Sequence, residues 1–201
     1  MQSISFLKSR AGNVALTPFF VAFATGMFFA AALHAQTEES RALELEGGGS
    51  VAYTLRMHPA DAHVARPAGE LAPTSALDAA RLLNLHLSAG DIEEAALLSN
   101  SPRRRFEVLR DYRESVGEEE FKRVFAQYFF PENRLLAEIV IGKHRLLIWD
   151  LKEGATRIAG QYFVEVEGRY LVDDVPNDER TSLRWVLEAY RAGKISSRPS
   201  P

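Results

Sequence analysis

The spacing of apolar residues changes once along the chain, at Pro131, and this change restricts the possible folds more than any other feature. From Ser75 to Phe129 the apolar residues recur with the period of about 3.6 residues that marks one face of a helix. After Pro131 they alternate with polar residues, as in strands. The turns between these strands are short, and such turns join only antiparallel neighbours. The sequence therefore predicts an α+β domain in which helices precede a curved antiparallel meander.

Four helices are predicted before Pro131. Ser75 and Asp78 have the spacing of a capping box at the start of the first helix, and Gly90 is suited to end it. Pro102 fits the first turn of a later helix, where its missing N–H is not needed. The four helices are expected to start at Ser75, Asp91, Asn100 or Ser101, and Glu118.

Four strands and one more helix are predicted after Pro131. Turns are expected at Gly142-Lys143, Glu153-Gly154 and Glu167-Gly168, and the resulting sheet is expected to have one apolar face. The last helix is expected from about Asp178 to Ala192. Its apolar stripe consists of Leu183, Val186, Leu187 and Tyr190.

The remaining segments are assigned by composition. Residues 36–57 alternate around three glycines and are expected to form a β-hairpin extension, with a disordered tether as the alternative. Residues 58–74 are rich in alanine and proline, which is typical of a linker. The α+β domain is expected over residues 75–192, and residues 193–201 are expected to be a disordered tail.

The first 35 residues have the order of a secretory signal peptide. Lys8 and Arg10 precede an uncharged apolar stretch that ends in small residues, so cleavage is expected after Ala32 or Ala35. An uncleaved N-terminal membrane anchor is the alternative, because the apolar run approaches the length of a bilayer span. The predicted location is periplasmic or secreted, or for the alternative the inner membrane with the domain facing the periplasm.

Composition excludes several classes of site. The chain has no cysteine, which excludes disulfides, thiolate zinc sites and thiol nucleophiles. Its formal net charge of −3 argues against a nucleic-acid binder, which needs a basic face. No phosphate loop or nucleophile elbow is present, so no cofactor is predicted. No metal site is predicted from the five histidines, which are His34, His58, His63, His86 and His144.

Two segments carry a resemblance to a known superfamily. Residues 160–175 read GQYFVEVEGRYLVDDV, with a glycine, basic, aromatic, apolar and Asp-Asp run at the end. This segment resembles the closing hairpin of nuclear transport factor 2-like (NTF2-like, cone-fold) domains, many exported members of which end in a similar run. Leu85 to Asn100 resembles their first helical hairpin, where a Gly-Asp pair separates two helices. The resemblance implies a cone-shaped pocket between sheet and helices, used in that superfamily for catalysis, ligand binding or protein contacts.

Four residues are candidates for lining a pocket: Trp149, Tyr162, Tyr170 and, at its mouth, Asp174. Such a pocket can bind a ligand, or hold a general base whose pKa is raised by desolvation. The competing interpretation is that the aromatic residues belong to the core and that the Asp173-Asp174 pair caps a turn or the next helix. No inward histidine beside a carboxylate can be assigned, so the catalytic residues are unknown.

Arg103-Arg104-Arg105 is the only basic cluster, and we expect a solvated helix face with ion pairs to the acidic residues that follow.

The function favoured by these features is non-catalytic binding of a small apolar ligand or a protein partner. One alternative is a small pocket enzyme of the isomerase or hydrolase type. Another is a structural partner in an envelope complex, with the N-terminal hairpin and the last helix as contacts. A homodimer remains one option.

Overall fold

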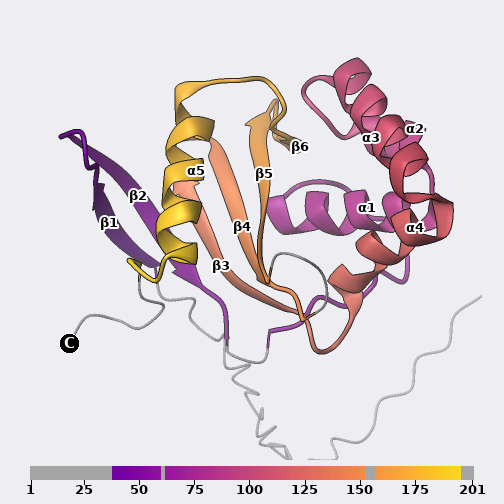
Figure 1. Ribbon diagram of the computed structural model, residues 1–201, viewed down its shortest axis with the longest axis horizontal. Helices are drawn as coiled ribbons and strands as arrows, with labels where there is room; N and C mark the ends of the chain where they lie inside the picture. The colour runs from indigo at the N-terminus through magenta and orange to yellow at the C-terminus, as the bar shows by residue number, and fades with distance from the viewer. Residues whose placement is uncertain (1–37, 60–61, 153–156, 196–201) are drawn as a thin grey trace, which may run out of the picture. The chain divides into compact units, whose positions relative to one another are not determined.

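A single antiparallel sheet with helices against both faces organises the part of the chain that the computed structural model describes, residues 38–59, 62–152 and 157–195 (Figure 1). The predicted signal peptide, its cleavage positions and residues 196–201 of the predicted tail lie outside these residues. Within the described ranges, no helix combines the length and the hydropathy that crossing a membrane requires.

Six strands follow one another across the sheet in chain order, and every neighbouring pair is antiparallel. The predicted hairpin is present and joins the meander directly, with Leu55 opposite Ile139. The segment expected as an extension therefore supplies two strands of the same sheet. The strands are β1 (Glu38–Glu44), β2 (Ser50–Met57), β3 (Arg134–Ile141), β4 (His144–Asp150), β5 (Ile158–Val166) and β6 (Arg169–Val172).

Helices occupy the positions that the sequence predicted, which together with the sheet confirms the α+β class. The Ser75 side chain accepts a hydrogen bond from the Asp78 N–H, and Gly90 has a left-handed φ of 85° after the last turn. Asn177 caps the last helix in the same way as Ser75 caps the first. The helices are α1 (Ala76–Ala89), α2 (Ile92–Leu97), α3 (Pro102–Val116), α4 (Glu118–Ala126) with the 3-10 turn η1 (Gln127–Phe129), and α5 (Asp178–Arg191).

The first core lies between the sheet and helices α1 to α4. Leu147, Trp149 and Phe163 point to this side and are at most 1% exposed. The ring of Tyr128 meets that of Trp149 edge to face, with 5.1 Å between the ring centroids. Burial raises the pKa of the Tyr128 hydroxyl to about 12.

A second core lies on the opposite face, beneath α5. Leu146 and Ile148 of β4 pack there with Leu183 and Val186 of α5, and all four are fully buried. The prediction of one apolar face is therefore wrong, because the sheet is covered on both sides. The uninterrupted apolar run from Leu146 to Trp149 is the sequence signal for a strand buried on both faces.

Gly160 allows α5 to approach β5 closely. A Cβ atom at this position would lie 2.6 Å from Cδ2 of Leu187 and 2.9 Å from Cδ1 of Leu146. Both leucines are enclosed in the second core, so neither side chain can move aside at low cost. The missing side chain of Gly160 thus sets the distance between the helix and the strand.

Candidate functional site

One half of β5 has a strand on only one of its sides. Its residues pair with β4 from Ile158 to Val164, whereas β6 pairs only with Phe163 to Val166 (Figure 1). The ladder ends where the Asp173 N–H donates to the Tyr162 carbonyl over 2.9 Å. The chain then turns away from β5, held by a 2.8 Å hydrogen bond from the Asp174 N–H to Asn100 Oδ1. The β5 edge is therefore open between Ile158 and Tyr162.

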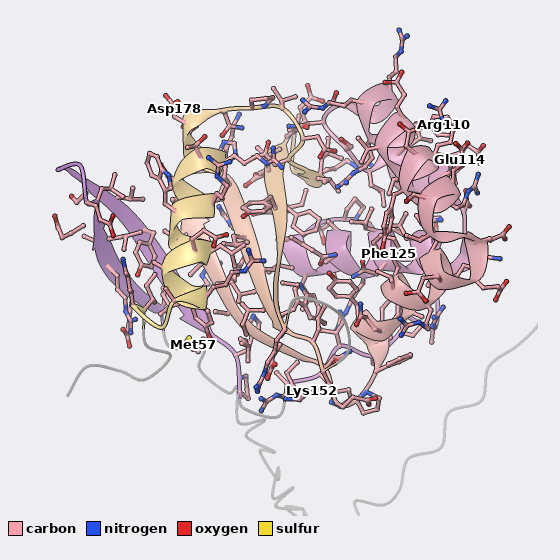
Figure 2. All side chains as sticks on the ribbon, in the orientation of Figure 1. Met57, Arg110, Glu114, Phe125, Lys152 and Asp178 are labelled. Atoms are coloured by element: carbon pink, nitrogen blue, oxygen red, sulfur yellow. The ribbon has the colours of Figure 1, made fainter. Side chains whose placement is uncertain are left out.

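A cavity of about 340 Å³ lies at this open edge, and we call it the β5-edge pocket. Helices α1, α3 and α4 contribute apolar side chains to it, and Phe125 of α4 is labelled in Figure 2. One wall consists of residues 160–163 of β5. The other lining residues are Leu83, Leu87, Leu109, Phe125, Tyr128, Val172, Arg105, Asp173, Asp174 and Arg180.

Arg105 is the first of two arginines in the β5-edge pocket, and its charge is compensated. Its Nε lies 3.0 Å from Oδ2 of Asp174, and Ser99 Oγ donates to the same oxygen over 2.7 Å. Burial lowers the pKa of the Arg105 guanidinium; the negative charge of Asp174 opposes this effect and the positive charge of Arg180 adds to it. Arg105 and Asp174 therefore form a nearly neutral pair at the wall of the pocket.

Arg180 is the second arginine, and it has no such compensation among the described residues. Its guanidinium lies 5.3 Å from the centroid of the Tyr162 ring, a cation–π contact. Its Nε is buried and has no hydrogen-bond partner in the described part of the chain. Burial raises the pKa of the Tyr162 hydroxyl beneath it, so this phenol is neutral near pH 7. Arg180 is thus a cation positioned at the pocket without a carboxylate partner.

The four residues predicted to line a pocket are separated by the strand register. Tyr162 and Asp174 line the β5-edge pocket. Trp149 is fully buried in the first core, and the Tyr170 hydroxyl donates to Glu165 over 3.4 Å. Because Tyr162 pairs with Leu146 and Trp149 with Ala159, Tyr162 lies on the α5 face while Trp149 and Tyr170 lie on the opposite face.

A buried histidine–carboxylate pair is present that sequence reasoning did not find. His144 Nδ1 lies 2.8 Å from Oδ2 of Asp173, and these residues are 5% and 0% exposed. Asn100 Nδ2 and Asn177 Nδ2 donate to the other oxygen of Asp173. The network ties the start of β4 to the segment before α3 and to the α5 cap. The Asp173 carboxylate thus holds Asn177, the residue whose side chain caps α5.

The sequence analysis did not identify either pocket arginine, although the sequence contains a signal for each. Arg105 was expected on a solvated face, as is true of Arg103, which pairs with Glu107. However, Arg105 lies one helical turn before the buried Leu109 and so shares its face. Arg180 precedes Leu183 by three residues and lies on the buried stripe of α5. An arginine on an apolar stripe was the available signal.

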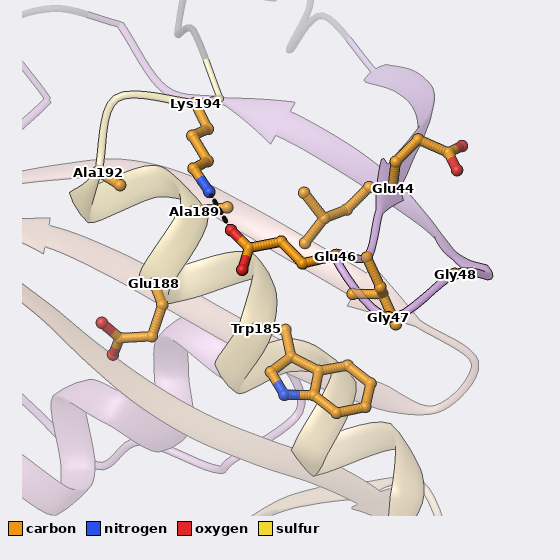
Figure 3. Close-up of a pocket in the computed structure, with 11 residues that line it drawn as sticks. Glu44, Glu46, Gly47, Gly48, Trp185, Glu188, Ala189, Ala192 and Lys194 are labelled. Carbon is orange, nitrogen blue, oxygen red and sulfur yellow. Dashed lines mark hydrogen bonds and ion pairs between the residues drawn. The ribbon is translucent and has the colours of Figure 1, made fainter.

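A second, larger cavity of about 690 Å³ lies between the hairpin and α5, and we call it the hairpin groove (Figure 3). Trp185 is 41% exposed within it. Lys194 Nζ lies 3.1 Å from Glu46 Oε1 across the groove. The other lining residues are Leu43, Glu44, Leu45, Gly47, Gly48, Glu188, Ala189 and Ala192.

Among the residues with a described position, no three His, Asp or Glu side chains gather closely enough to hold a metal ion. Comparisons of the chain with protein-family models, with curated proteins and with solved structures each find no match.

Proposed function

We propose that this domain binds, without transforming it, a small molecule that has an apolar body and a carboxylate. The β5-edge pocket is the binding site. The observation that carries this proposal is Arg180, a cation without a carboxylate partner in the described structure, which lines a cavity together with leucine and phenylalanine side chains.

The size and lining of the pocket support this ligand class. About 340 Å³ is at the lower end of the range of small-molecule sites. Leu83, Leu87, Leu109 and Phe125 offer contact to an apolar chain or ring. A ligand carboxylate at Arg180 supplies the negatively charged partner that this guanidinium lacks. Such charge-assisted hydrogen bonds are strong in a partly desolvated site.

We also propose that binding takes place outside the cytoplasm and that the fold is a variant of the NTF2-like cone. The predicted signal peptide in the first 35 residues supports a location outside the cytoplasm. The sequence of residues 160–175 supports the NTF2-like variant. In such a variant, the hairpin widens the sheet and α5 covers its second face.

The test compares two probes of equal chain length, sodium octanoate and 1-octanol, by isothermal titration calorimetry on the purified protein. We expect octanoate to bind more tightly than octanol. Arg180→Gln should weaken octanoate binding by about ten- to a hundredfold, the worth of a hydrogen bond to a charged group, and leave octanol nearly unchanged.

Arg110→Gln is the matched control, because Arg110 lies on the exposed side of α3 and already pairs with Asp111. It should bind octanoate like the unaltered protein. The proposal is wrong if octanoate and octanol bind equally, or if neither binds.

Protein contact at the hairpin groove is a second candidate function. It is favoured by Trp185 of α5, whose exposed indole lines the groove between α5 and the hairpin together with apolar residues. The hairpin and α5 are the two elements that the sequence suggested as contacts. If a second copy of the chain is the partner, native mass spectrometry should show a dimer that Trp185→Ser abolishes. Val108→Ser, which alters an exposed residue of α3, should keep the dimer. A monomer at every concentration contradicts dimerisation.

A further inference from the structure

The open edge of β5 restricts the ligand class further. We propose that the β5-edge pocket binds the carboxy-terminal end of a peptide, which lies along β5 as a short added strand and places its carboxylate at Arg180. This inference rests on the proposed function, because it assigns a chemical class to the ligand of the same pocket.

The backbone N–H and C=O groups of Gly160 point away from β4. Along a strand, the N–H and C=O groups of successive residues point alternately to the two sides. Glu165 donates to Lys143, on the β4 side, and Tyr162 accepts from Asp173, on the β6 side. The backbone N–H and C=O groups of the even-numbered residues of β5 therefore point away from β4. Gly160 is one of these residues.

Gly160 lies beyond the end of β6. The ladder between β5 and β6 ends at the hydrogen bond between Asp173 and Tyr162. Two residues before Gly160, the Ile158 carbonyl accepts a hydrogen bond from Nε of Arg191 over 3.0 Å. Gly160 lies between these two satisfied positions, and its N–H and C=O face the β5-edge pocket.

The residue after Gly160 carries a buried hydrogen-bond acceptor. The Gln161 side chain donates to Asn84 Oδ1 over 3.0 Å, but its own Oε1 is buried without a partner among the described residues. A buried oxygen that lacks a donor is costly, and native proteins rarely tolerate one. A peptide contributes N–H groups as well as carbonyls, whereas a simple fatty acid contributes no donor.

Together these groups match the end of a peptide chain. In a strand added parallel to β5, the carbonyl of one peptide unit accepts a hydrogen bond from the Gly160 N–H, and the N–H two residues later donates to the Gly160 carbonyl. The peptide then runs toward Tyr162, and its terminal carboxylate binds Arg180, which contacts the Tyr162 ring. The apolar lining from α1, α3 and α4 accommodates apolar side chains such as leucine.

The experiment uses acetyl-Leu-Leu with a free carboxylate and its ester analogue, in which oxygen replaces the amide N–H between the two leucines. The ester keeps the shape, the carboxylate and the apolar side chains but cannot donate to the Gly160 carbonyl. We expect the ester to bind about tenfold more weakly than the amide in calorimetric titrations.

A second measurement reports on Gly160 itself. In NMR spectra of protein isotopically labelled at its glycines, acetyl-Leu-Leu should shift the Gly160 amide resonance. It should also slow the exchange of the Gly160 amide proton with solvent. The ester should produce smaller changes. Equal affinity for amide and ester, with the Gly160 resonance unmoved, would overturn the inference.

The octanoate titration separates this outcome from failure of the proposed function. If octanoate binds and depends on Arg180, but amide and ester bind equally, only the peptide inference falls. If neither octanoate nor the dipeptide binds, both fall. A longer peptide ending in the same two leucines distinguishes sources: binding as tight as that of the dipeptide supports the end of a longer chain, and much weaker binding supports a free dipeptide.

Discussion

Gly160 borders the second core on one side and the β5-edge pocket on another. On the α5 face the space for a Cβ is taken by Leu187 and Leu146. At the strand edge, its backbone groups face the β5-edge pocket. Any side chain here must therefore push against the second core, whatever its effect on ligand binding.

We predict that Gly160→Ala lowers the free energy of unfolding by about 1–3 kcal/mol, the usual cost of overpacking a core. Urea denaturation followed by circular dichroism measures this change. Gly47→Ala is the control, because no atom lies within 4 Å of the added Cβ in the hairpin turn. Equal midpoints for the two variants would show that the second core adapts and that α5 is not fixed by Gly160.

At the scale of elements, α5 contributes to both the stability and the proposed site. Leu183, Val186 and Leu187 close the second core, while Arg180, one turn before Leu183, lines the β5-edge pocket. The sequence analysis included this helix in the domain of residues 75–192 and gave it a contact role in one alternative. The structure shows that it packs on β3, β4 and β5 and closes the second core.

We predict that Leu183→Ala lowers the free energy of unfolding by about 2–5 kcal/mol, because it leaves a cavity at a fully buried position. Thermal and urea unfolding provide the measurement. Leu97→Ala is the matched control on α2, where the side chain is 60% exposed, and we expect a change within about 0.5 kcal/mol. A similar small effect for Leu183→Ala would mean that α5 does not stabilise the sheet.

At the scale of the whole molecule, the sequence predicted the elements well because their signals are local. Capping residues such as Ser75 and Asp91 act within one turn of helix, and the turn glycines act within a few residues. The α+β class and the antiparallel pairing followed from these signals.

The relations between distant segments were not predictable in the same way. The contact between His144 and Asp173 and the separation of Tyr162 from Trp149 depend on strand register. Register is set by packing on both faces, and a shift of one residue exchanges the faces. The candidate site was therefore only half predicted, with Tyr162 and Asp174 at the pocket and both arginines missed.

Because of the order of the strands, one strand pair carries most of the loop-closure entropy cost of forming the sheet. β1 meets β2 through a short turn, and the strands of the β3 to β6 meander are also close in sequence. Only β2 and β3 must close a loop of residues 58–133. Loop-closure entropy rises with loop length, and contacts between distant residues slow folding. The ladder between β2 and β3 is therefore the pairing that is entropically most costly to form within the sheet, and the hairpin depends on it for its place there.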